Sequence, residues 1–269
     1  MKKKKIAIGF FGISRSLKWT APSIYKNIII PIRSIYDLKI FGHFYKIKFI
    51  KNKRSGENQA PDPDDHKNLK FDELVIQNPT AVLNAANYQN ILSYGDAWQD
   101  DGKSLSNLIY QLSSLKMLAK MIIKQKPDVV ILLRPDLYYH DSFLNAVKLQ
   151  LEMPSFYASI PEWQWFGGLN DRFAVLGYEA FLVYASRLDY VFEFLEKKQK
   201  SLHSEKFLWH TLVHHGIHIT PTKIRASRIR VNGFSVLENF KGLSLSKLIR
   251  YKFFNFANKM KRLFSMGRS

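Results

Sequence analysis

Cysteine is absent from the 269 residues of this sequence. Disulfide scaffolds, zinc–thiolate centres and cysteine nucleophiles are therefore excluded. A reducing compartment is compatible with this composition. Long apolar runs are also missing, since no window reaches the roughly 18 uncharged apolar residues that a membrane span needs. We therefore expect a cytoplasmic protein that is either soluble or peripheral to a membrane.

Acidic residues are scarce, with 22 Asp and Glu against 41 Lys and Arg, which gives a formal net charge of +19. Such an imbalance indicates an anionic partner, a class that includes nucleic acid, anionic lipid and phosphorylated substrates. Hydrophobic residues make up 46% of the chain, so a core can form and global disorder is not expected. The length suits one large domain, or a domain with an appended element.

The N-terminus imitates a signal peptide, because four lysines precede an apolar run. That run covers only residues 6–13, and it ends at Ser14 and Arg15 without a small-residue cleavage site. It is better interpreted as a buried strand over residues 6–11, followed by a turn at Gly12.

The first half of the sequence alternates strand-like and helical patterns. After the strand at residues 6–11, a helix is expected from about Pro22, then a strand from residue 37 to near His43. Residues 51–68 are polar and rich in Pro and Asp, which predicts a loop. Residues 73–79 read as a third short strand.

The clearest helix covers residues 104–126, with apolar residues at spacings of three and four. Ser104 is the predicted N-cap and Pro127 the predicted stop. Residues 128–133 follow as a strand that is apolar on both faces, as a central parallel strand is. This alternation predicts an α/β fold with a mainly parallel, Rossmann-like sheet flanked by helices.

The second half predicts a strand-like run, a Trp/Gly loop and a helix carrying Phe181 through Leu195. A shorter helix is expected to start at a serine cap, Ser204, and to end at Gly216. Residues 218–233 are predicted to be extended.

The tail, residues 241–269, contains eight Lys or Arg and no acid. Seven of its apolar residues align on one helical face; they are Leu245, Leu248, Ile249, Phe253, Phe256, Met260 and Phe264. A basic amphipathic helix is typical of a peripheral membrane anchor. The alternative is a helix that packs on the main domain. We therefore divide the chain into a domain at 1–240 and a membrane-associating tail at 241–269.

A candidate site follows the strand at residues 128–133. Ligands of open α/β sheets bind beyond the carboxyl ends of the strands, where Arg134 and Asp136 are expected. An aspartate there can ligate a divalent cation through hard oxygen atoms. The alternative is a simple Arg–Asp salt bridge at the end of the strand.

Three further clusters are candidates for chemistry. Asn170, Asp171 and Arg172 place an amide, a carboxylate and a guanidinium side by side, suited to sugar hydroxyls or phosphates, although an Asx-type turn with a surface arginine would look the same. Glu205, in the first turn of a helix, could deprotonate an acceptor hydroxyl. The alternative is a capping role alone, because the helix dipole favours a carboxylate at that position. The loop after the first strand offers Arg15 to a nucleotide, but it matches neither GxGxxG nor a Walker A loop.

The motifs IAIGFFGISRS, NLIYQLSSLK, DVVILLRPDLYY, GLNDRFAVLG and SEKFLWHTLVHHGI occur in an order that resembles bacterial glycosyltransferases of surface-polysaccharide gene clusters, which make lipopolysaccharide or capsule and are similar to GT-A enzymes. The resemblance covers residues 5–233. It implies catalytic roles for Asp136, Asp171 and Glu205. It also implies a set of donor contacts, namely Gly12, Arg15, Gln111, Ser114, Arg134, Asn170 and Arg172.

The same resemblance implies a nucleotide-sugar donor, a glycan or lipid-linked glycan acceptor, and a place at the inner face of the plasma membrane. It implies a divalent cation, Mn or Mg, held at Asp136. Here Arg134 stands where the first Asp of a DxD motif would be, so part of the work of the cation could fall to Arg134. No nucleic acid is expected as a partner.

Two other functions fit parts of the sequence. A sulfotransferase would use the loop GISRS, residues 12–16, for the phosphate of a sulfonucleotide and would have no use for Asp136. A non-catalytic nucleic-acid-binding protein would fit the charge, but no RRM, KH or zinc-finger motif is present.

Overall fold

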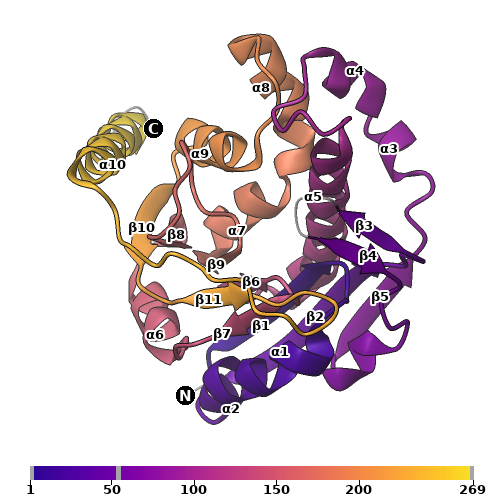
Figure 1. The fold of residues 1–269 in the computed structure, drawn as a ribbon. Coiled ribbons are helices and arrows are strands. Elements are labelled where there is room, and N and C mark those ends of the chain that lie inside the picture. Colours follow the sequence, from indigo (N-terminus) through magenta and orange to yellow (C-terminus); the bar gives the residue numbers. More distant parts are fainter. Residues whose placement is uncertain (1–2, 53–55, 267–269) are drawn as a thin grey trace.

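The computed structural model describes residues 3–52 and 56–266. Seven strands form one central sheet, and β9 is the member that runs antiparallel to its neighbours β6 and β8. The expected α/β architecture with a mainly parallel sheet is therefore confirmed (Figure 1). In spatial order, the strands are β10 (His218–Thr222), β8 (Tyr157–Pro161), β9 (Phe173–Gly177), β6 (Val129–Leu133), β1 (Lys5–Gly12), β2 (Asp37–Tyr45) and β5 (Glu73–Gln77).

The central strand β1 shows why the sheet is covered on both faces. Its residues alternate between two buried clusters, with Ile6, Ile8 and Phe10 in one and Ala7 and Phe11 in the other. A strand with apolar side chains on both faces is stable only between two layers.

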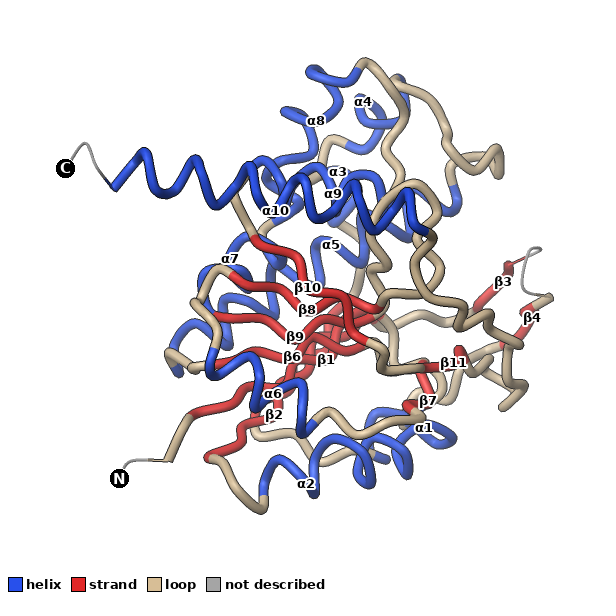
Figure 2. The backbone as a smooth tube through the Cα atoms, turned by 90° about the vertical axis from the view of Figure 1, so that its left-hand side faces the viewer, coloured by secondary structure: helices blue, strands red, loops and turns tan. Residues whose placement is uncertain are grey.

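Helices supply these two layers (Figures 1 and 2). One layer is formed mainly by α5 (Lys103–Ile122), α7 (Tyr178–Ala185), α8 (Val191–Lys198) and α9 (Ser204–His214). The other contains α1 (Leu17–Ile24), α2 (Ile30–Arg33) and α6 (Leu144–Glu152). Two short helices, α3 (Val82–Ala85) and α4 (Tyr88–Ser93), join β5 to α5.

The start of α1 differs from the prediction. The helix begins at Leu17, and Pro22 lies inside it, before a π-helical segment at Tyr25–Ile29. The buried carboxylate of Asp65 accepts hydrogen bonds from the backbone N–H groups of Leu17 and Lys18, both at 2.9 Å. These are two of the N–H groups that a helix start leaves unpaired. The capping group thus comes from a residue 48 positions away in the chain.

Three other helix predictions were wrong in detail. Gly102, with φ of 73°, precedes α5, and the predicted cap Ser104 instead donates its N–H to the carboxylate of Asp100. His203 precedes α9, so Ser204 is its first helical residue. The single helix expected through Leu195 is divided into α7 and α8 by a 3₁₀ turn at Arg187–Tyr190.

The predicted loop and the predicted extended segment both contain short strands. The loop 51–68 contributes to the antiparallel pair β3 (Ile50–Asn52) and β4 (Glu57–Gln59) and holds a 3₁₀ turn at Asp65–Asn68. The extended segment 218–233 supplies β10 and also β11 (Ala226–Arg228), which pairs antiparallel with β7 (Leu137–Tyr139). This second small sheet brings the chain after β10 back over the end of β6.

The tail forms helix α10 (Leu245–Met266), beside the edge strand β10 (Figure 2). The side-chain amide of Asn255 accepts from the N–H of Ile219 at 3.0 Å and donates to its C=O at 2.7 Å. An edge strand leaves such groups unpaired, so Asn255 completes the pairing of β10. No helix in the described part of the chain combines the length and apolarity needed to cross a membrane.

The face of α10 that contacts the body is not the predicted apolar face. Tyr251 and Phe254 pack towards Trp165 and Trp209. The predicted face instead points to solvent, with four of its side chains 60% to 73% exposed; these are Leu245, Ile249, Phe253 and Phe256. The side chains of Met260 and Phe264 lie outside the described residues.

We predict that Asp65→Ala lowers the free energy of unfolding by about 1–2 kcal/mol, because it leaves the start of α1 without its capping carboxylate. Urea denaturation followed by circular dichroism measures this change. Asp64→Ala is the matched control, since the side chain of Asp64 forms an exposed ion pair with Lys67 and such pairs contribute little. Equal losses in the two variants would contradict the capping role of Asp65.

Candidate active site at the carboxyl edge of the sheet

The direction of β9 brings two predicted clusters together. Six of the seven strands end at the same edge of the sheet, and β9 begins there because it runs the other way. Leu133, the last residue of β6, is paired with Phe173, the first residue of β9. Arg134 and Asp136 therefore lie near the segment at residues 170–172.

A cleft of about 680 Å³ opens at this edge. Five basic side chains and two carboxylates line it, and they are Arg15, Lys51, Arg134, Arg228, Arg230, Asp136 and Asp171. Aromatic side chains also line the cleft, namely Phe11, Tyr45, Phe49, Trp98 and Tyr110. The cleft thus combines a strongly cationic part with flat apolar surfaces.

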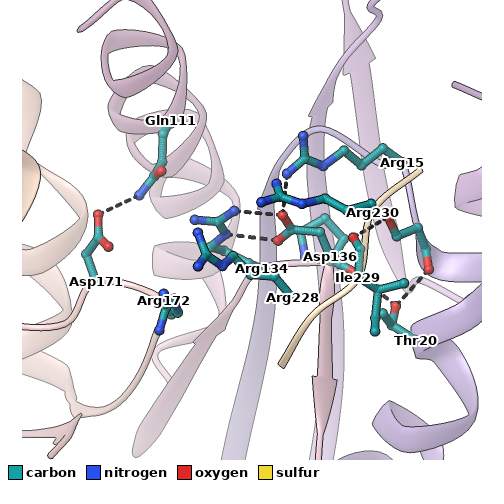
Figure 3. A network of polar contacts seen from close by, with 12 residues as sticks. Arg15, Thr20, Gln111, Arg134, Asp136, Asp171, Arg172, Arg228, Ile229 and Arg230 are labelled. Atoms are coloured by element: carbon teal, nitrogen blue, oxygen red, sulfur yellow. Dashed lines mark hydrogen bonds and ion pairs between the residues drawn. The ribbon is translucent and has the colours of Figure 1, made fainter. Parts of the chain in front are cut away.

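Asp136 lies at the centre of the cationic part and is 3% exposed. Arg134 donates to both of its carboxylate oxygens, from Nε to Oδ1 at 2.9 Å and from Nη2 to Oδ2 at 2.7 Å. Arg15 donates from Nη2 to Oδ2 at 2.6 Å. Figure 3 shows the two guanidinium groups converging on this one carboxylate.

These contacts fix the protonation state of Asp136. Burial by itself would raise its pKa, but the charges and hydrogen bonds of Arg134 and Arg15 outweigh burial and hold the pKa well below its usual range. Asp136 is therefore a carboxylate at any physiological pH. The alternative stated for the sequence, an ion pair between Arg134 and Asp136, is present. Arg15 forms a second ion pair with the same carboxylate.

Two more buried carboxylates each hold a pair of arginines. Glu57, on β4, lies 3.1 Å from Nη1 of Arg230 and 3.7 Å from Nη1 of Arg15. Glu238 accepts from Nε of Arg228 at 2.7 Å and lies 3.3 Å from Nη2 of Arg172. The guanidinium groups are thereby held in defined positions along one side of the cleft.

The donor set does not fit the divalent cation that was predicted at Asp136. A hard cation needs several oxygen ligands, and both oxygens of Asp136 already accept hydrogen bonds from arginines. Within residues 3–52 and 56–266, no group of three or more histidine and carboxylate side chains is arranged to hold a metal ion. We therefore assign no chemical step to a metal at this site.

Asp171 lines the cleft, and Glu205, which does not line it, lies near enough to Asp171 for their charges to interact. Nε2 of Gln111, on α5, donates to Oδ2 of Asp171 at 3.3 Å. Glu205 accepts from the backbone N–H of Phe166 at 2.8 Å. Burial and the nearby charge of Asp171 raise the pKa of Glu205 to about 7. A carboxylate with such a pKa can accept a proton near neutral pH.

Of the remaining predicted residues, Gly12 lines the cleft and the others are buried behind its surface. Gly12 lines the cleft with φ of 102°, and Ser114 is fully buried behind it, accepting the N–H of Gly12 at 2.8 Å. Asn170 is buried, and its side chain bonds to the backbone of Trp163 and Arg172. The guanidinium of Arg172 lies 4.7 Å from the centre of the Trp163 ring. Ser114 and Asn170 thus support the shape of the site from below its surface.

The sequence did not predict a role for Arg228 and Arg230, or for their partners Glu238 and Glu57. The signal is present in the alternation Arg228-Ile229-Arg230, because Ile229 is buried and both arginines therefore point to the other side of the segment. The pairing could not be read from the sequence, since Arg230 and Glu57 are 173 residues apart.

No protein-family model matches the chain, and no curated protein matches it. Solved structures that resemble it include the apo form of mouse xyloside xylosyltransferase 1, which is 11% identical. The similarity covers 82% of this chain and 85% of that one, with a TM-score of 0.44. An active-site mutant of LgtC is 10% identical, with 77% and 69% covered and a TM-score of 0.42. At these values the likeness assigns no activity to this chain.

We predict that Glu205 makes stability depend on pH. Because its pKa is raised to about 7 from 4.5, its favourable contribution is full below pH 4.5 and is lost as the pH rises through about 7. Glu205→Gln removes this titration while keeping an oxygen for the N–H of Phe166. Relative to wild type, the variant should therefore become more stable between pH 5 and pH 8.

Urea denaturation at several pH values measures this difference. Glu196→Gln, on the exposed side of α8, is the control and should show no such trend. A stability difference for Glu205→Gln that stays constant across this pH range would contradict the raised pKa.

Proposed function

We propose that this protein is a glycosyltransferase that moves a sugar from a nucleotide-sugar donor to a hydroxyl of an acceptor glycan. The observation that carries the proposal is a single cleft, at the ligand-binding edge of an α/β sheet, that joins aromatic side chains, an arginine cluster and the carboxylate of Asp171. The ordered sequence motifs that resemble surface-polysaccharide glycosyltransferases of the GT-A type support the same activity.

The two halves of the cleft suit the two ends of a nucleotide diphosphate. Aromatic rings such as Tyr45, Trp98 and Tyr110 offer stacking surfaces for a nucleobase. Guanidinium groups such as Arg15 and Arg134 offer charge and paired N–H donors to phosphate oxygens. The donor sugar would then lie towards Asp171 and Gln111, beyond the arginines.

The reaction needs one bond to form and one to break. An oxygen of the acceptor hydroxyl attacks C1 of the donor sugar, and the bond from C1 to the diphosphate oxygen breaks, with its electrons leaving on the diphosphate. The hydroxyl proton passes to the carboxylate of Glu205, whose pKa of about 7 matches this task. The arginines stabilise the negative charge that develops on the leaving group.

We further propose that the acceptor is lipid-linked, as in lipopolysaccharide or capsule synthesis, and that residues 241–269 hold the domain at residues 1–240 to the inner face of the plasma membrane. The support is the exposed apolar face of α10 together with its charge. The tail has eight basic residues and no acid, which complements anionic lipid headgroups.

We predict that one nucleotide stabilises the protein selectively in a thermal-unfolding screen of the diphosphates UDP, GDP and CDP and the monophosphate CMP. Binding to the folded state adds about 2.7 kcal/mol of stability at a hundredfold excess over the dissociation constant. The 3′-phosphorylated adenosine sulfonucleotide is the matched test of the sulfotransferase alternative. Stabilisation by that nucleotide alone would contradict glycosyl transfer.

The variant Glu205→Gln separates binding from chemistry. In the thermal screen it should bind the nucleotide as wild type does, because Glu205 is distant from the diphosphate in this proposal. In a turnover assay, transfer or slow hydrolysis of the matching nucleotide sugar should fall by about a hundredfold or more. Unchanged turnover in this variant would contradict its role as the base.

We predict that Ile249→Ser combined with Phe256→Ser releases the protein from anionic vesicles. Each substitution removes an exposed apolar side chain that would enter the lipid interface. The loss of partitioning free energy is about 1.5 kcal/mol per residue, or about tenfold in the partition coefficient. Co-sedimentation with vesicles of phosphatidylcholine and phosphatidylglycerol measures the change. Leu237→Ser, an exposed leucine outside α10, is the control, and equal partitioning of all variants would contradict the anchor.

A further inference from the structure

The arginines of the site form two networks of ion pairs, and buried carboxylates connect the arginines within each network. One runs from Arg134 through Asp136, Arg15 and Glu57 to Arg230, and the other joins Arg172, Glu238 and Arg228. We call the eight residues together the arginine cradle. It contains five guanidinium groups and three carboxylates, so two positive charges have no negative charge within it.

The arrangement of charge in the arginine cradle is one-sided. The three carboxylate side chains are at most 4% exposed, whereas the five arginine side chains are 10% to 31% exposed. Glu57 and Glu238 do not line the cleft, and Asp136 lines it with both carboxylate oxygens bonded to arginines, so the charge that the cradle presents to the cleft is mainly positive. Four of the five arginines line the cleft directly, and they are Arg15, Arg134, Arg228 and Arg230.

This arrangement is suited to an anion with several oxygens. A guanidinium group has five N–H donors in a fixed plane, and the contacts to Asp136 use two donors of Arg134 and one of Arg15. Holding the side chains against buried acids removes much of the freedom that binding would otherwise have to restrict. The cradle is thus preorganised for phosphate groups before any ligand arrives.

We propose that the arginine cradle binds the diphosphate of the donor directly. It neutralises the charge of the diphosphate, a role that the sequence-based prediction gave to a divalent cation at Asp136. Asp136, Glu57 and Glu238 are positioning residues in this arrangement, because each acts on the ligand through the arginines that it holds. The proposal rests on the proposed glycosyltransferase function for the identity of the ligand. It goes beyond that function by naming the groups that neutralise the leaving diphosphate.

Titration calorimetry with inorganic pyrophosphate tests the proposal, because pyrophosphate carries the anion without base or sugar. Binding is expected in the presence of EDTA, and the affinity should fall as salt rises. Arg230→Gln should weaken binding by about tenfold, as expected for loss of one charged hydrogen-bonding group. Arg230→Lys should recover only part of the affinity, since it restores the charge but not the planar fork.

Arg225→Gln is the matched control. Arg225 lies five positions earlier in the same segment and pairs with Asp141 outside the cleft, so its loss should leave pyrophosphate affinity unchanged. Unfolding midpoints of each variant show whether a loss of binding reflects loss of the fold. A similar loss in Arg225→Gln and Arg230→Gln would overturn the proposal, because only general charge would then matter.

The failure of the cradle and the failure of the proposed function give different results. Pyrophosphate binding or sugar transfer that requires Mn or Mg and disappears in EDTA would overturn the cradle while leaving glycosyl transfer in place. Pyrophosphate binding in EDTA without binding of any nucleoside diphosphate would support the cradle and contradict the nucleotide-sugar donor.

Discussion

The antiparallel pairing of β9 with β6 is the constraint on which the site depends. In a fully parallel sheet, the segment before β9 would lie at the opposite edge from the segment after β6. Because β9 runs the other way, Phe173 pairs with Leu133, and the polar residues that flank each strand meet. Hydrogen bonds of the sheet backbone thus place Asp171 and Arg172 beside Arg134, before any side-chain interaction contributes.

Burying the carboxylates of the cradle costs desolvation free energy, which their ion pairs with the arginines offset. Moving a carboxylate out of water is unfavourable by several kcal/mol, and an ion pair recovers this only with good geometry and full hydrogen bonding. Asp136 meets both conditions, with three charged hydrogen bonds to two arginines. A well-packed apolar cluster would serve stability equally well. What it could not do is keep several like charges together at one side of a cleft, so the pattern is better explained by binding than by stability.

The sequence predicted those features that depend on local pattern. A continuous apolar run at residues 129–133 indicated a central strand, and the polar residues after it fell at the ligand-binding edge because parallel strands share their direction. Features that depend on partners distant in the chain were not predicted. Asp65 caps α1 from 48 positions away, whereas the local pattern predicted a start near Pro22.

The same distinction holds at the site. Arg134 and Asp136 are two positions apart, and their ion pair was weighed as an alternative from the sequence. Arg15 reaches the same carboxylate from 121 positions away, and nothing in its own surroundings marks it as a partner of Asp136. The direction of β9 was equally hidden, because its run FAVLG, residues 173–177, is apolar on both faces and would suit either direction.

Helix α10 connects the two proposals about membrane and acceptor. Its docked side reaches the acidic part of the site, since Lys247 donates to the backbone C=O of Trp165, next to the residue whose N–H binds Glu205. Burial and Asp171 raise the pKa of Glu205, and the charge of Lys247 opposes them. If the exposed face of α10 lies on a membrane, α10 stands between that membrane and the backbone at Trp165 and Phe166, to which Glu205 bonds. An acceptor attached to lipid would then approach Glu205 and Asp171, while a soluble donor enters along the arginines.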